Sequence, residues 1–309
     1  MGIVNIAVIG TGYLGKFHAQ KYQALENCQL TGLIDSDPAT LKEMASLYPQ
    51  AATSADIHSL IDDVDAVSIA TSTPSHYEIA KQFLQRGKHV LLEKPMTSTI
   101  EQGQELIRLA KNNQCILQIG HIERFNPTVL AMDEHMQQPK FIESQRLSPF
   151  KSRGTDVNVI LDLMIHDIDI ILSIVKSNIE SIQASGMRVL SDDIDIANAR
   201  ITFSNDCVAN VTASRVSIKS ERKLRLFQDN AYFSADLGNH DLKIYTRDDG
   251  EINSQSFNFE KSDALLTEIT HFLDCIHNNS QPLVSGTDGL RALQTANQIV
   301  NTIQLHNAK

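Results

Sequence analysis

Three glycines with a fixed spacing, close to the start of the chain, constrain the fold more than any other feature. The segment Gly10–Gly15 (GTGYLG) directly follows the apolar, β-branched run Ile3–Ile9 and precedes Lys16–Leu25, which has the pattern of an amphipathic helix. In a strand–turn–helix of this kind, the first glycine makes the tight turn, the second lets the backbone approach a pyrophosphate, and the third lets the helix pack closely on the strand. The free N–H groups at the start of the helix then face the phosphates. The sequence therefore predicts a dinucleotide site that includes Gly10, Gly12, Tyr13, Leu14 and Gly15.

A carboxylate follows at the distance that such a site requires. The predicted strand Leu30–Ile34 ends in Asp35, roughly 20 residues beyond the last glycine, where an acidic side chain binds the ribose hydroxyls of adenosine. The sequence Asp35-Ser-Asp37 offers no Arg or Lys to a 2′-phosphate, which favours NAD over NADP. The alternative is that Asp35 only caps a helix that begins at Pro38, and the glycines upstream disfavour it.

Predicted strands and helices alternate through the first 120 residues. The further strands are Ala66–Ala70, His89–Leu92 and Cys115–Ile119, and the further helices are Leu41–Tyr48, His76–Arg86 and Ile100–Asn112. This alternation predicts a doubly wound parallel sheet, which binds its ligand at the carboxyl ends of the strands. Residues 1–120 are therefore expected to form an NAD-binding Rossmann domain.

Polar segments follow three of these strands and supply the other candidates. A Lys held between Glu93 and Pro95 at a strand end is placed to move protons, whereas the alternative is a Glu–Lys pair on the surface. Arg124 could anchor a substrate anion or pair with Glu123. The cofactor-binding candidates here are Thr71, Ser72, Thr73, Pro74, His76, Glu93 and Lys94, and the substrate-binding candidates are His121 and Arg124.

The run Val159–Val175 predicts a helix that is apolar nearly all round, and is therefore buried. Asn158, Asp162, His166 and Asp169 form one polar stripe on it at 100° per residue. Buried carboxylates and an imidazole are costly unless they are paired or line a cavity. The stripe is thus either a structural Asp–His hydrogen bond or one wall of an active site, with Asn158, Asp162 and His166 at the substrate.

Strands without intervening helices dominate the second half. Those predicted are Phe141–Leu147, Ile179–Val189, Asp195–Phe203, Cys207–Val216, Lys223–Phe227, Ala231–Ala235, Leu242–Tyr245 and Gln255–Phe259, and the helices Asp263–His277 and Thr287–Leu305 close the chain. We expect residues 121–309 to form an open-faced, mainly antiparallel sheet domain for substrate binding and homo-oligomerisation. The last helix could pack back on the first domain. Most basic residues of this half are expected to be surface charges, some of which would meet any substrate diphosphate: Arg146, Lys151, Arg153, Arg215, Lys219, Arg222 and Lys223.

Charge and cysteine use narrow the class of protein. The net charge of −10 argues against a nucleic acid or an anionic membrane as partner. Ionisable residues inside Val159–Val175 argue against a membrane span. The cysteines are isolated, without metal-binding spacing, and no secretory signal is visible. The sequence therefore predicts reduced thiols, no metal site and a cytoplasmic location.

Taken in order, these motifs resemble the Gfo/Idh/MocA family of oxidoreductases over essentially the whole chain. The matching pieces are GTGYLG at Gly10–Gly15, Asp35, TSTPSH at Thr71–His76, EKP at Glu93–Pro95, and the D-x-x-x-H-x-x-D pattern that begins at Asp162. The resemblance implies NAD(P)-dependent oxidation or reduction at a secondary hydroxyl of a sugar, cyclitol or sugar nucleotide, with Lys94, Asp162 and His166 around the reacting carbon. It also implies dimers or tetramers built through the open sheet face.

Within the family, GHIERFNP at Gly120–Pro127 most resembles a bacterial branch that oxidises UDP-N-acetylglucosamine at the 3-hydroxyl. In that branch the 3-keto sugar is aminated on the way to a lipid A precursor. A dehydrogenase of a free sugar, cyclitol or dihydrodiol is the alternative, and a non-enzymatic dinucleotide sensor is a further one. His166 is the preferred general base and Lys94 the cation that stabilises the developing alkoxide, although the reversed assignment stays open.

Overall fold

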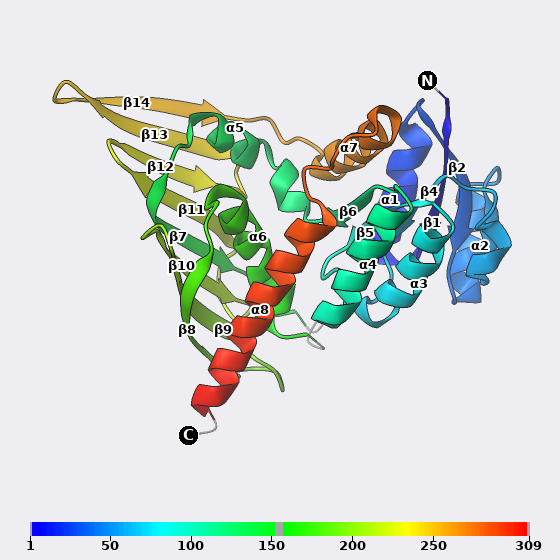
Figure 1. The fold of residues 1–309 in the computed structure, drawn as a ribbon, viewed down its shortest axis with the longest axis horizontal. Helices are drawn as coiled ribbons and strands as arrows, with labels where there is room; N and C mark the ends of the chain where they lie inside the picture. Colours follow the sequence, from blue (N-terminus) through cyan, green and yellow to red (C-terminus); the bar gives the residue numbers. More distant parts are fainter. Residues whose placement is uncertain (1, 152–156, 308–309) are drawn as a thin grey trace. The chain divides into compact units, whose positions relative to one another are not determined.

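The computed structural model describes residues 2–151 and 157–307, and its chain divides into two compact units (Figure 1). The first unit contains the residues up to Ile122 together with Asp263–Leu290, and the second contains Glu123–Ser262 together with the residues from Arg291 onward. The sequence places one boundary after Gly120 and assigns all of 121–309 to the second domain. The structure differs at residues 263–290, which return to the first unit.

A parallel sheet forms the centre of the first unit. Within the described residues it has six strands in the order β3-β2-β1-β4-β5-β6, and neighbouring strands run parallel. The strands are β1 (Val4–Ile9), β2 (Cys28–Ile34), β3 (Ala52–Ser54), β4 (Ala66–Ile69), β5 (His89–Glu93) and β6 (Leu117–Gly120). This confirms the predicted Rossmann sheet. The order reverses between β1 and β4, which is where such sheets bind ligands.

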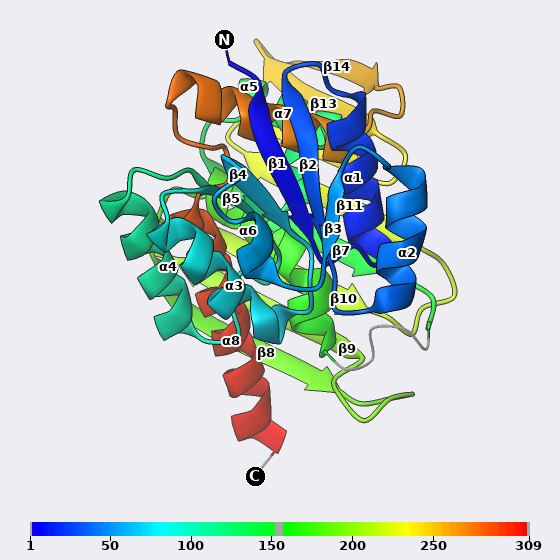
Figure 2. The ribbon, with the colours of Figure 1, turned by 90° about the vertical axis from the view of Figure 1, so that its right-hand side faces the viewer.

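Helices cover both faces of this sheet (Figure 2). On one face lie α1 (Tyr13–Ala24), α2 (Pro38–Leu47) and α7 (Ala264–Asn278), and on the other α3 (Thr73–Gln85) and α4 (Ile100–Asn112). Helix α7 belongs to this unit because its buried side chains Leu265, Ile269 and Phe272 share one core with Ala19 and Tyr22 of α1. These side chains form an apolar stripe on α7 that must be buried against another element, and the side of α1 that faces the sheet buries it.

The second unit is built on a larger sheet. Its described strands have the order β14-β13-β12-β11-β7-β10-β9-β8, antiparallel except for the parallel pair β7 and β10. The strands are β7 (Pro139–Leu147), β8 (Ile179–Met187), β9 (Ile196–Phe203), β10 (Val208–Ser214), β11 (Glu221–Gln228), β12 (Ala231–Asp236), β13 (Asp241–Asp248) and β14 (Glu251–Asn258). The mainly antiparallel sheet is confirmed. The strand β7 comes first among these strands in the sequence but lies in the middle of the sheet, between β10 and β11.

Among the residues that the structure describes, helices pack on one face of this sheet only (Figure 1). They are α5 (Pro127–His135), α6 (Ile165–Ile174) and the second-unit part of α8 (Gly286–Asn307), and their apolar side chains share one core with the inward positions of the strands. The opposite face carries an aromatic row, defined as Phe141, Phe227, Tyr232 and Tyr245, one residue from each of four adjacent strands. Successive ring centroids of this row are 5.9, 4.8 and 5.8 Å apart. Among the described residues, no helix combines the length and apolarity needed to cross a bilayer.

Candidate active site

The three positions of the β1–α1 turn are glycines for different structural reasons. Gly10 has a φ of +80°, and a Cβ there would lie 2.7 Å from Thr71 Cγ2, so only glycine fits. A Cβ at Gly15 would lie 1.9 Å from the Gly10 carbonyl oxygen. At Gly12, by contrast, no described atom beyond its chain neighbours lies within 4 Å of the Cβ position. The first and third glycines therefore shape the turn, and the second keeps open the space that a pyrophosphate would take.

Asp35 is held at the carboxyl end of β2. Its Oδ2 accepts hydrogen bonds from Thr11 N at 2.8 Å and Thr11 Oγ1 at 3.2 Å, and its Oδ1 accepts one from Asp37 N at 2.9 Å. The cap of α2 is Asp37, which accepts from the N–H groups of Ala39 and Thr40. The bonds from Thr40 and Ala39 hold the pKa of Asp37 below its ordinary value. The capping role considered for Asp35 therefore belongs to Asp37.

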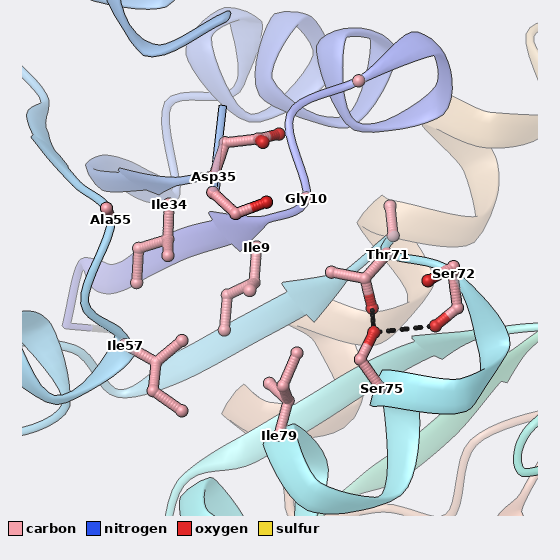
Figure 3. A pocket seen from close by; sticks show the side chains of 13 residues that line it. Ile9, Gly10, Ile34, Asp35, Ala55, Ile57, Thr71, Ser72, Ser75 and Ile79 are labelled. Carbon is pink, nitrogen blue, oxygen red and sulfur yellow. Dashed lines mark hydrogen bonds between the residues drawn. The ribbon is translucent and has the colours of Figure 1, made fainter. Parts of the chain in front are cut away.

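A cavity of about 420 Å³ opens beside this turn (Figure 3). Asp35 and the glycine turn line one side, and the side chains of Ile9, Ile34, Ile57 and Ile79 converge on the other. Such a cavity suits an apolar ring beside a hydroxylated sugar. The side chains and the open space at Gly12 therefore fit the adenosine half of NAD and its pyrophosphate.

Only some of the predicted cofactor-binding residues line this cavity. Those that line it are Gly10, Gly12, Asp35, Thr71 and Ser72, whereas Tyr13, Leu14, Gly15, Thr73, Pro74, His76, Glu93 and Lys94 are not among its lining residues. Sequence reasoning missed Ile9, Ile34, Ser36, Ala55, Ile57, Ala70, Ser75 and Ile79. The last residues of β1 and β2 could have been found, because strand ends of a parallel sheet converge on the ligand. Ala55 and Ile57 follow β3, a strand that the sequence did not predict.

Two loops of the first unit are joined by a buried histidine. The imidazole of His76 is 1% exposed and contacts the carbonyl oxygen of Pro95 at 2.9 Å and that of Thr71 at 3.0 Å. Burial lowers its pKa, although both carbonyl contacts oppose this. His76 therefore holds the segment after β5 against the segment after β4. Lys94 lies in the held segment and is half-buried.

In the second unit, the helix that carries the predicted polar stripe starts with an irregular turn. A π-helical turn, η3 (Ile160–Met164), precedes α6, and Asn158 caps it by accepting a hydrogen bond from Leu161 N at 3.0 Å. Asp162 and His166 are half-buried, whereas Asp169 is 2% exposed and pairs with Arg124 at 3.5 Å. The wider π turn breaks the constant 100° step, so the predicted stripe is not uniform. Arg124 therefore forms an ion pair with a carboxylate of α6, whereas the sequence suggested its neighbour Glu123 as the partner.

Glu123 instead belongs to a buried charge cluster. Arg146 donates to Glu123 at 2.9 Å and forms a bidentate pair with Asp167 at 2.9 and 3.0 Å, while Arg222 donates to Glu123 at 3.0 Å. Burial alone would raise the pKa of Glu123, but the two guanidinium groups hold it below its ordinary value. The cluster joins the segment after β6 to α6 within the second unit.

Two of the basic residues expected at the surface are buried. Arg146 is 4% exposed, and Arg215 is 5% exposed and donates to Asp195 at 2.7 Å. Arg215 also donates to the carbonyl of Val157, directly before the cap Asn158. Both arginines therefore hold the second unit together, and a surface role for them is wrong. Arg153 lies outside the described residues.

Two models of known protein families match the chain. A family model described as an oxidoreductase family with an NAD-binding Rossmann fold matches residues 4–121, and the model of the Gfo/Idh/MocA C-terminal domain matches residues 128–234. The chain belongs to the Gfo/Idh/MocA family of oxidoreductases. The resemblance drawn from the motifs is thereby confirmed, as is the NAD-binding character of the first unit.

Individual relatives span nearly the whole chain. It is 38% identical over 304 residues to the UDP-N-acetylglucosamine 3-dehydrogenase of Acidithiobacillus ferrooxidans, covering 96% of each protein. A solved structure of that enzyme superposes with a TM-score of 0.94 at 36% identity, covering 99% of each chain. The myo-inositol 2-dehydrogenase of Thermotoga maritima is 25% identical, covering 94% of this chain and 93% of the relative.

Proposed function

We propose that this Gfo/Idh/MocA oxidoreductase uses NAD to oxidise UDP-N-acetylglucosamine at the 3-hydroxyl, giving the 3-keto sugar. The observation that carries the proposal is the 38% identity over 96% of each chain to a dehydrogenase named for that reaction. The segment GHIERFNP supports the same branch. In the structure, its Glu123 and Arg124 form ion pairs with Arg146 and Asp169, so the segment helps to build the second unit around α6.

The cofactor preference follows from Asp35. Thr11 and the backbone of Asp37 hold this carboxylate in place. A fixed carboxylate accepts hydrogen bonds from ribose hydroxyls and repels the charge of a 2′-phosphate, which supports NAD over NADP.

The proposed chemistry assigns one role to each of three side chains. NAD, held by Asp35 and the glycine turn, would supply the acceptor for the hydride of the substrate carbon. His166 acts as the general base that takes the hydroxyl proton, since an imidazole ordinarily titrates near neutral pH. The ammonium group of Lys94 stabilises the negative charge that develops on the substrate oxygen. Asp162, one helical turn before His166, orients the imidazole or holds a neighbouring hydroxyl.

The test is an oxidation assay on a panel of substrates. UDP-N-acetylglucosamine, UDP-N-acetylgalactosamine, free N-acetylglucosamine and myo-inositol are each mixed with NAD, and the absorbance of reduced nicotinamide is followed. A carbonyl reagent traps the keto product, so that an unfavourable equilibrium does not hide turnover. We expect UDP-N-acetylglucosamine to be oxidised with a kcat/KM at least about tenfold above the others. Equal or higher turnover of a sugar without the nucleotide would refute the assignment.

Lys94→Met and His166→Gln test the assigned roles. Each variant should retain NAD binding, measured by calorimetry, and lose at least about a hundredfold in kcat. Near-normal turnover in either variant would rule out the role assigned to the substituted residue.

A second candidate is oxidation of an inositol, favoured by the relative from Thermotoga maritima at 25% identity. The myo-inositol arm of the same assay separates the two. A dinucleotide sensor is a third possibility from the sequence alone, and turnover of any sugar in the panel excludes it.

We further propose that a second copy of this chain covers the open face of the eight-stranded sheet, giving a homodimer or homotetramer. The aromatic row supplies the apolar area, and the cross-strand pair of Arg225 with Glu143 at 3.4 Å places both signs of charge on the same face. A face with mixed charge is compatible with a copy of itself across a two-fold axis. The cytoplasmic location drawn from the sequence also stays a proposal.

A further inference from the structure

We propose that His18 is a positioning residue for Lys94, and that it acts through Glu93. This inference rests on the function proposed above, in which Lys94 stabilises charge on the substrate oxygen. His18 follows the glycine turn on α1, in a part of the sequence to which the motif analysis gives no role. It is 0% exposed and does not line the cavity beside Gly12. Any effect on the reaction must therefore pass through the groups it contacts.

The imidazole of His18 joins two strand ends of the first unit. Its Nδ1 lies 2.7 Å from Ser68 Oγ on β4, and its Nε2 lies 3.2 Å from Glu93 Oε1 at the end of β5. With Glu93 as a carboxylate and a neutral imidazole, Nε2 carries the hydrogen and donates it, and Nδ1 accepts the hydrogen of Ser68. This fixes one tautomer and gives every polar atom of the ring a partner. The contact also neutralises part of the cost of burying the carboxylate of Glu93, which is only 8% exposed.

The other oxygen of Glu93 reaches the backbone of the next residue. Oε2 accepts a hydrogen bond from Lys94 N at 3.3 Å. The carboxylate fits there because β6 ends in Gly120, where a Cβ would lie 2.8 Å from Glu93 Oε1. The side chain of Glu93 is therefore confined by His18 on one side and by a glycine on the other.

Two histidines thus hold the Glu93-Lys94-Pro95 segment from opposite ends. His18 fixes the carboxylate before Lys94, and His76 contacts the carbonyl oxygen of Pro95 after it at 2.9 Å. A flexible lysine gains precise placement only if its backbone is fixed, since a misplacement of about 1 Å can cost roughly a hundredfold in rate. The pair of histidines supplies that fixed backbone.

The experiment compares His18→Asn with His18→Gln. An asparagine amide takes the place of Nδ1 and keeps the contact with Ser68, but leaves Glu93 without its donor. A glutamine amide takes the place of Nε2 and keeps the donor to Glu93. Amide hydrogen exchange of the peptide that contains Lys94 is measured without cofactor, and kcat and the KM values are measured with NAD and UDP-N-acetylglucosamine. Ser68→Ala, which loosens the imidazole from the far side, is the milder variant if His18→Asn does not fold.

We expect His18→Asn to raise the exchange rate of the Lys94 amide about tenfold, the effect of losing one hydrogen bond to a charged group. Its kcat should fall at least about tenfold with little change in the KM for NAD, and His18→Gln should recover both properties to within about threefold. An unchanged Lys94 amide in His18→Asn overturns the inference. So does a His18→Gln variant that melts like the wild type but is as impaired as His18→Asn. Because the exchange measurement needs no turnover, it stands even if no sugar in the panel is oxidised, and that result would refute only the proposed function.

Discussion

Gly15→Ala should lower the stability of the first unit, whereas Gly12→Ala should lower its affinity for NAD. A Cβ at Gly15 would lie 1.9 Å from the Gly10 carbonyl oxygen, against a contact limit of 3.0 Å. The turn between β1 and α1 would have to move by about 1 Å, and an overpacked site of this kind costs about 3 kcal/mol. In a unit of this size that lowers the melting temperature by roughly 6–12 °C.

Gly12→Ala meets no described atom within 4 Å, chain neighbours apart. Its stability should change by less than about 1 kcal/mol, the difference between glycine and alanine at a helix cap. The methyl group instead occupies the space proposed for the pyrophosphate. Lengthening hydrogen bonds to a charged group removes about 1.5–3 kcal/mol, which is roughly a 10- to 100-fold loss in NAD affinity.

Thermal melting without cofactor and isothermal titration with NAD separate the two variants. Gly15→Ala should melt early, and Gly12→Ala should melt normally but bind NAD weakly. A Gly12→Ala protein that binds NAD as tightly as the wild type would show that the pyrophosphate does not pass over this turn.

Four further predictions concern charge, cofactor preference and assembly. Arg146→Met should cost about 3–5 kcal/mol in urea unfolding, because Glu123 and Asp167 lose the cation they share, and a loss below about 1 kcal/mol would contradict a tight cluster. The folded pKa of Glu123 lies below its ordinary value. Its contribution to the free energy of unfolding is therefore fully present above the unfolded pKa of about 4.3 and disappears as the pH falls through the folded pKa. The difference in melting temperature between the wild type and Glu123→Gln should vanish in acid for this reason. Asp35→Ser should weaken NAD binding about tenfold and narrow its preference over NADP, measured by titration with both cofactors, and an unchanged preference would contradict its role. Tyr232→Glu should convert the proposed oligomer to monomers in light scattering, and an unchanged mass would contradict an interface on this face.

Most of the fold could be predicted from local patterns in the sequence. The buried strands β1, β2, β4 and β5 read as short apolar runs between helices, and this pattern alone indicates a parallel sheet. The strand β3 was missed because its three residues are largely exposed and have no apolar pattern. Helix α5 was missed although Asn126 and Pro127 form a recognisable helix start, with Asn126 accepting a hydrogen bond from Thr128 N.

The site was predictable where backbone geometry dictates the residue. Gly10 and Gly15 have steric reasons that the motif spacing encodes, and Asp35 follows from the length of one helix and one strand. The pair of Arg124 with Asp169 was out of reach, because it joins residues far apart in sequence and depends on how the turns pack. The π turn before α6 also has no sequence signal of its own, so the helical wheel of that segment was only approximate.

The return of α7 to the first unit has a consequence during synthesis. The core beside α1 needs Leu265, Ile269 and Phe272, which leave the ribosome about 140 residues after Ile122. At cellular elongation rates that interval is roughly 7–28 s. Throughout it, the apolar side of α1 has no helix against it, so the nascent nucleotide-binding unit is exposed to aggregation and to chaperones until the sheet of the second unit has been translated. A truncated protein that ends near residue 122 should for the same reason be insoluble.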